Sequence, residues 1–133
     1  MNKIYNNLTY KNLIKTDWIE QFDEAQQIEI KKGIENKVDL SVYAKTDFDS
    51  FQMFEIRIGL KDNLDVGWYT NPDFDSLEMN EIKLGLRKGL DVSKYAKTEL
   101  SWNKMNIIRS ELERKQNYEK RIQKLNCRKL NKN

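Results

Sequence analysis

Two copies of one pattern decide the fold: FDSFQMFEIRIGLKDNLDVGWYT at residues 48–70 and FDSLEMNEIKLGLRKGLDVSKYA at residues 74–96. Phe74 follows Phe48 by 26 positions, and the copies align without insertion or deletion. The same spacing finds a related unit from Phe22 to Tyr43 and an opening half-unit from residue 100 to residue 112. Such a period is typical of stacked supersecondary units. The sequence therefore predicts an all-α fold built as a short helical repeat array, each unit a helix, a turn and a short helix.

Helix-start signals open each unit. Asp49 is the predicted N-cap of the first turn, and Gln52 three residues later completes a capping box. Asp23 with Gln26 and Asp75 with Glu78 repeat the device. Inside the unit, Met53, Ile56 and Leu60 follow the i, i+3, i+7 spacing of one apolar helix face. We expect these helices to end near Asn63 and Gly89, residue types that tolerate a left-handed backbone.

Glycine recurs inside each predicted helix, at Gly33, Gly59 and Gly85. A glycine in a helix costs about 1 kcal/mol relative to alanine, so a packing reason is expected. The reason that we favour is the close approach of a neighbouring helix.

A Leu-Asp-Val or Val-Asp-Leu turn follows each helix and places aspartate at Asp39, Asp65 and Asp91. These residues are the predicted caps of the second, shorter helices, which carry the tyrosines 43, 69 and 95. A shared metal site is the alternative for such recurring carboxylates. Residues on successive units lie about 10 Å apart, too far for one divalent ion to bridge.

The breaker signals disappear after residue 100, so one long helix is predicted from Ser101 to about Cys127. We expect a single domain comprising residues 1–133, with an N-terminal cap (1–21), three repeats (22–99), and a half-repeat with a basic C-terminal helix (100–133). Trp18 and Ile19 are expected to cover the open end of the first unit.

No catalytic constellation is visible. The chain has no histidine and one cysteine, which removes the commonest general base, a disulfide framework and a multi-cysteine metal site. We expect no enzyme activity, no cofactor and no metal. No run of 18 apolar residues or signal-like segment occurs, so we expect no membrane contact and a cytoplasmic location.

Charge is unevenly distributed and suggests two binding surfaces. Residues 21–100 hold 11 Lys or Arg against 16 Asp or Glu, and residues 101–133 hold 10 against 3. A negative surface suits a basic protein, whereas a basic helix suits phosphates. The candidate contacts on the repeats are Trp68, Asp62, Asp73 and Glu78. Those on the C-terminal helix are Arg109, Arg114, Lys115, Lys120, Arg121, Lys124 and Arg128.

Residues 22–112 resemble a helical repeat of accessory proteins of phages and conjugative elements in Firmicutes, with the pattern F-D-x-x-Q-M-x-E-I-R-x-G-L-x-x-G-L-D-V-S-x-Y-A. The resemblance implies a small anti-defence protein in the cytoplasm of a bacterial host, of the kind of an anti-CRISPR-like inhibitor that binds an effector complex. Gln27 in place of the first methionine, Gly67-Trp68 and the basic tail depart from the pattern.

Three functions are therefore open. The first is a non-enzymatic inhibitor from a mobile genetic element that blocks a CRISPR-Cas or restriction complex by occupying a functional surface. The second is an accessory protein that binds nucleic acid through residues 109–129. The third is a structural or oligomerising module in which the charged helix pairs with a second copy.

Overall fold

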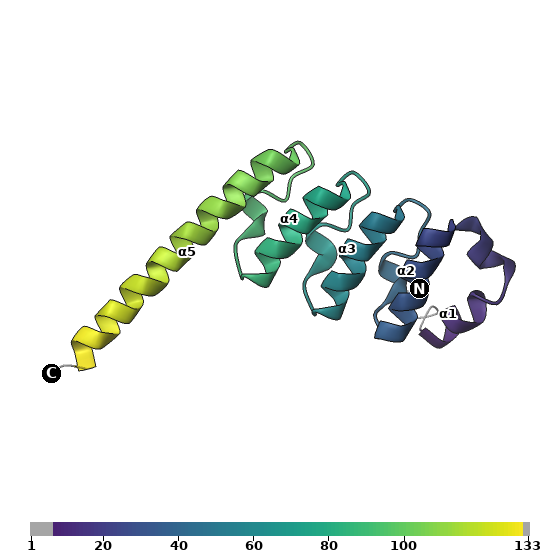
Figure 1. Cartoon of the computed structure of the whole chain (residues 1–133), viewed down its shortest axis with the longest axis horizontal. Helices are drawn as coiled ribbons and strands as arrows, with labels where there is room; N and C mark the ends of the chain where they lie inside the picture. Colours follow the sequence, from purple (N-terminus) through teal and green to yellow (C-terminus); the bar gives the residue numbers. More distant parts are fainter. Residues whose placement is uncertain (1–6, 132–133) are drawn as a thin grey trace.

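The computed structural model describes residues 7–131, and this part of the chain is all-helical, with five α-helices and no strand. The α-helices are α1 (Asn7–Leu13), α2 (Glu24–Asn36), α3 (Ser50–Lys61), α4 (Ser76–Arg87) and α5 (Trp102–Asn131). Helices α2 to α5 lie side by side in chain order, each packed on the next (Figure 1). We call α2, α3, α4 and the part of α5 that packs on α4 the stack. The predicted all-α class and the long C-terminal helix are confirmed. Residues 1–6 of the predicted cap and residues 132–133 lie outside the described part.

All three predicted capping boxes are present, at Asp23, Asp49 and Asp75. Two of them also join neighbouring helices. The Gln26 amide nitrogen donates to the Phe48 carbonyl at 2.7 Å, and that of Gln52 donates to the Phe74 carbonyl at 2.6 Å. In these two units, the glutamine that closes the capping box therefore also fixes where the next helix begins.

The core lies between successive helices. The apolar residues predicted for one face of each helix form this core. Met53 and Ile56 of α3 and Met79 and Ile82 of α4 are fully buried. Asn63 and Gly89 have φ values of 58° and 67°, so both helices stop where the sequence predicted. Helix α5 continues to Asn131, four residues beyond the predicted end at Cys127.

Each predicted short helix is a single 3-10 turn of three residues: η3 (Leu40–Val42), η4 (Val66–Trp68) and η5 (Val92–Lys94). The carboxylates of Asp39 and Asp91 cap η3 and η5, but Asp65 makes no side-chain cap bond. The serine hydroxyls two residues after Asp39 and Asp91 donate to these carboxylates. Gly67 has no hydroxyl, so Asp65 lacks this second anchor.

Our explanation of the helix glycines was wrong. At Gly33, Gly59 and Gly85 the closest atom to an added Cβ is the tyrosine hydroxyl of the same unit, at 2.0 Å in every case. That tyrosine leaves the 3-10 turn and lies across its own helix, and its hydroxyl donates to a helix carbonyl at 2.7 Å, Glu55 in the case of Tyr69. The glycine leaves room for the ring and not for a neighbouring helix.

Buried ion pairs cross each helix–helix boundary. Glu29 pairs with Arg57 at 2.7 Å and Glu55 pairs with Lys83 at 2.6 Å. Glu81 makes the corresponding pair with Arg109 on α5. A buried pair contributes little net stability but penalises any alignment that leaves one charge alone. These pairs therefore favour one register between successive helices.

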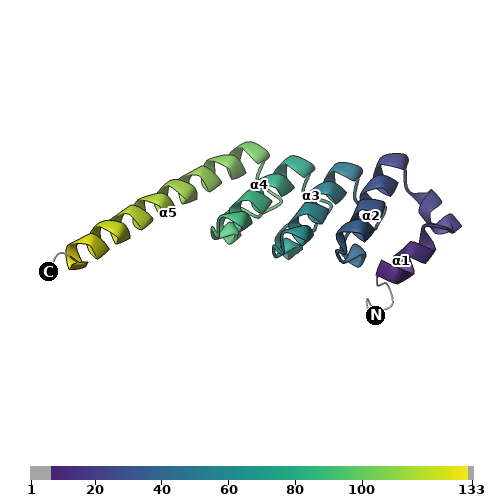
Figure 2. The same cartoon turned by 60° about the horizontal axis from the view of Figure 1, so that its bottom comes forward.

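The two ends of the stack differ. At the first end, η2 (Asp17–Gln21) lies before α2, and Trp18 packs edge-to-face against Tyr10 and Phe22, as expected for a covering role. Gln27 stands where the repeat pattern has methionine, and its side-chain amide donates to the Ile19 and Phe22 carbonyls. At the other end, the C-terminal part of α5 extends past α4 with no element beside it (Figures 1 and 2).

Candidate interaction surface

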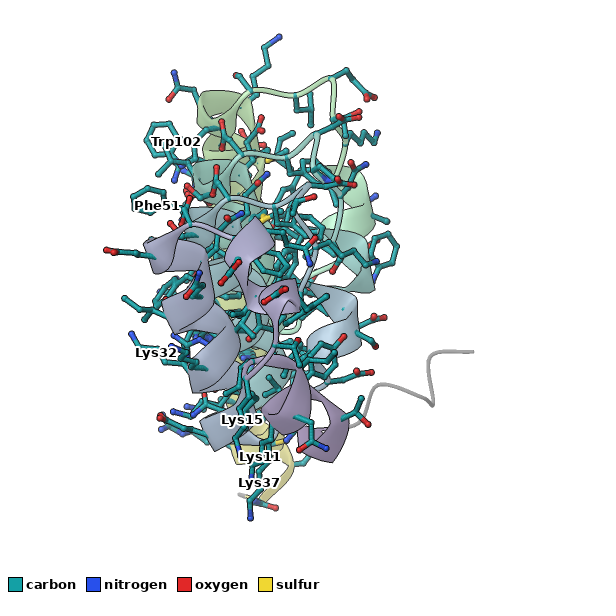
Figure 3. The ribbon with its side chains drawn as sticks, turned by 90° about the vertical axis from the view of Figure 1, so that its right-hand side faces the viewer. Lys11, Lys15, Lys32, Lys37, Phe51 and Trp102 are labelled. Atoms are coloured by element: carbon teal, nitrogen blue, oxygen red, sulfur yellow. The ribbon has the colours of Figure 1, made fainter. Side chains whose placement is uncertain are left out.

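Exposed apolar side chains follow one face of the stacked helices. Ile28, Phe51, Phe54 and Leu77 occupy two helix positions that recur every 26 residues, Ile28 matching Phe54 and Phe51 matching Leu77. Phe51 is 71% exposed and Leu77 is 57% exposed. Trp102, at the start of α5, projects on the same side as Phe51 (Figure 3). We call these five residues the outer strip.

A hollow of about 400 Å³ lies in the strip between α2 and α3. Its wall comprises Ala25, Ile28, Glu29, Ser50, Phe51 and Phe54. Phe54 also covers two of the buried ion pairs, because the Arg57 guanidinium lies 5.4 Å and the Lys83 ammonium 5.8 Å from its ring centre. The hollow is therefore apolar at its rim and sits over charges that already have partners.

Exposed basic residues occur toward the C-terminal ends of α2, α3 and α4. Lys32 lies below Phe51 on the same side of the molecule (Figure 3), and Lys61 and Arg87 occupy exposed positions near the ends of α3 and α4. An apolar patch with a charged rim is the usual composition of a protein–protein contact surface.

The sequence analysis did not name the strip. Its residues fall outside the i, i+3, i+7 core pattern, and that pattern alone was used to assign apolar positions. The available signal was a second apolar series, displaced by two positions from the first.

Three of the predicted repeat contacts are exposed but separate from the strip. Trp68 is on the 3-10 turn η4, and Asp73 is in the loop before α4. Asp62, at the end of α3, pairs with Arg87 at 2.6 Å. The structure thus does not gather these residues with the five strip residues into one site.

Two of the predicted contacts have structural partners. Glu78 is only 9% exposed and its carboxylate accepts the Asp75 backbone N–H, so it closes a capping box and does not belong to an exposed acidic ridge. Arg109 is bonded to Glu81 and to Glu113 within the stack, which raises its pKa. Lys88 beside Glu113, with Arg109 as a smaller cause, holds the pKa of that carboxyl below its usual range.

The other predicted basic contacts, from Arg114 to Arg128, all lie on α5 and are exposed. They form a surface distinct from the strip, on the part of α5 that leaves the stack (Figure 1). Within residues 7–131, no helix is long and apolar enough to cross a membrane, and no group of three or more histidine, cysteine, aspartate or glutamate residues could hold a metal ion.

Comparisons with known proteins do not assign a family. No protein-family model matches the sequence, no curated protein matches it, and no solved structure matches the fold.

Proposed function

We propose that the chain is a three-unit helical repeat array of period 26 that binds a protein partner through the outer strip, without catalysing a reaction. The single observation that supports this most is the strip itself, five large apolar side chains exposed on one face. Keeping such a surface in water is unfavourable by about 25 cal/mol per Å², and binding a partner removes the cost.

The packing of the stack makes the strip a rigid surface. Phe51 and Phe54 stand on α3, whose register is fixed on both sides by buried ion pairs and on one helix end by a capping box. Little conformational entropy is lost when a side chain on such a scaffold binds, so more of the contact energy appears as affinity.

The class of target comes from the resemblance of residues 22–112 to accessory proteins of mobile elements. On that ground we propose that the partner is a bacterial defence complex, CRISPR-Cas or restriction, and that the bound strip blocks a functional surface of it. The chain would then act in the cytoplasm of the host cell.

The test is phage plating on cells that carry a defence system and express the chain. Expression is expected to restore plaques, and Leu77→Glu is expected to abolish the effect because it places a charge in the strip. Ile107→Glu is the matched control, since Ile107 is also 57% exposed but occupies a helix position outside the strip series. Deleting residues 117–133 is expected to leave inhibition intact, because residues 117–131 are exposed and lie outside the strip.

Equal plating with Leu77→Glu and with the original chain would remove the strip from the mechanism. If no defence system among the CRISPR-Cas and restriction types is inhibited, the target class is wrong. Binding of purified effector, measured by calorimetry with both variants, separates these two failures.

A further inference from the structure

The free half of α5, residues 114–131, is not used by the proposed strip. Gln116 donates to the Lys88 carbonyl at 2.9 Å and is the last residue of α5 with a hydrogen bond to the stack. Every residue from Asn117 to Asn131 is exposed. The two views of the chain agree that this segment stands alone in solvent (Figures 1 and 2).

Positive charge dominates this segment. It carries seven basic residues and one acidic residue, Glu119. The basic residues are Arg114, Lys115, Lys120, Arg121, Lys124, Arg128 and Lys129. None of the seven makes an ion pair or a side-chain hydrogen bond within residues 7–131, whereas Arg109, earlier on α5, is paired with Glu81 and Glu113. Seven unpaired cations on one helix make a strong anion-binding surface.

The charges are spread around the helix in a definite way. At 3.6 residues per turn, Arg114, Arg121 and Arg128 recur every seven residues and lie close to one line along the helix. Lys120 and Lys124 fall on one side of that line, and Asn117, Lys120, Arg121 and Lys124 line a shallow hollow there. Lys115 and Lys129 fall on the other side. The acidic Glu119 is turned away from the arginine line.

We propose that the free half of α5 binds double-stranded DNA by lying in the major groove, with the two lysine flanks contacting the phosphates of the two groove walls. The major groove of B-DNA is about 12 Å wide and admits an α-helix. At 1.5 Å per residue, a helical segment of this length extends for about 27 Å, most of one turn of the duplex. The other helices of the described residues do not obstruct this approach, because the segment projects beyond α4 (Figure 1).

Other occupants fit the same surface less well. A second copy of the segment would bring seven like charges against seven, which opposes pairing. An acidic protein surface would contact the lysines on one side of the arginine line and leave the lysines on the other side unpaired. The groove supplies negative charge on both sides, which is the arrangement that the lysines match.

The test measures fluorescence anisotropy of a labelled duplex of about 20 base pairs with the full chain, over about 50 to 200 mM salt. The variant is Arg121→Gln/Lys124→Gln/Arg128→Gln. The control is Lys45→Gln/Lys61→Gln/Lys97→Gln, which removes the same charge from exposed positions on the stack and its loops. Glutamine keeps helix propensity, and circular dichroism verifies that both variants retain the helix content of the original chain.

The original chain is expected to bind with a micromolar dissociation constant that weakens steeply with salt. The α5 variant is expected to lose about two orders of magnitude in affinity at about 100 mM salt, and its salt slope is expected to fall by about 2.7, or 0.9 for each lost phosphate contact. The control is expected to remain within about threefold. Arg121→Lys/Arg128→Lys keeps the charges and is expected to keep the slope.

Several results would overturn the proposal. They are no binding at about 50 mM salt up to about 100 µM protein, an equal loss in the control, or a salt-independent affinity. If an RNA duplex of the same length binds equally well, the helix does not lie in the major groove, because the major groove of A-form RNA is too narrow for a helix. A dimer in light scattering that the α5 variant dissociates, without DNA affinity, would show that the segment binds a second copy.

Discussion

Replacing Gly59 by alanine tests the tightest contact in the fold. The new methyl group would lie 2.0 Å from the Tyr69 hydroxyl and 2.6 Å from Val66 Cγ1, both far inside contact distance. An exposed helix glycine normally gains about 1 kcal/mol on conversion to alanine. Here the fully buried ring of Tyr69 must move, so Gly59→Ala is expected to lower the free energy of unfolding instead of raising it.

The magnitude follows from two losses and one gain. Forcing an extra carbon into a packed site costs about 1–3 kcal/mol. The displaced Tyr69 hydroxyl also loses its hydrogen bond to the Glu55 carbonyl, which costs about 1 kcal/mol. Subtracting the helix gain of about 1 kcal/mol leaves a destabilisation of about 1–3 kcal/mol. Urea unfolding followed by circular dichroism measures the free energy of unfolding directly.

Two further variants make the test specific. Gly67→Ala is the control, because its new methyl group meets only the Asp65 carboxylate at 3.2 Å, and it is expected to change stability by less than about 0.5 kcal/mol. Tyr69→Phe removes the hydroxyl that the new methyl group would clash with. It is therefore expected to reduce the free energy of unfolding by about 1 kcal/mol less in the Gly59→Ala variant than in the original chain. An increase in stability with Gly59→Ala, or no coupling, would refute the reasoning.

Three other predictions concern the cap, the tyrosines and the ion pairs. Glu78→Gln is expected to stabilise the fold by about 1 kcal/mol in urea unfolding, because the side-chain amides of Gln26 and Gln52 donate hydrogen bonds to the next unit and the Glu78 carboxylate donates none. Burial raises the pKa of Tyr43, Tyr69 and Tyr95, so the folded state keeps protons that the unfolded state releases above about pH 10. Stability is therefore fully present below that pH and falls above it, by about 4 kcal/mol at about pH 11 for three groups, which unfolding curves and tyrosinate absorbance can follow. Glu29→Leu alone is expected to cost about 3 kcal/mol by leaving Arg57 unpaired, and Glu29→Leu/Arg57→Met is expected to recover most of it on thermal melting.

Local signals in the sequence predicted the local parts of this fold. The Asp49 and Gln52 capping box and the stop at Asn63 depend on residues within one helix turn, so their spacing alone is sufficient. The reason for Gly59 was not predictable in the same way. It depends on the ring of Tyr69, ten residues after Gly59, which turns back across its own helix. The sequence does not predict which way that ring points.

The candidate surface was missed for a physical reason. A helix in a single-layer stack packs neighbours on two sides, and the apolar residues that do so bear the i, i+3, i+7 spacing of Met53, Ile56 and Leu60. Phe51 and Phe54 carry the same spacing, displaced by two positions, and in a sequence an apolar residue has the same appearance whether a neighbour covers it or not. Burial separates the two series, because Met53 and Ile56 are fully buried while Phe51 is 71% exposed. The core series alone holds the stack, so the second series is free to serve the partner binding proposed above.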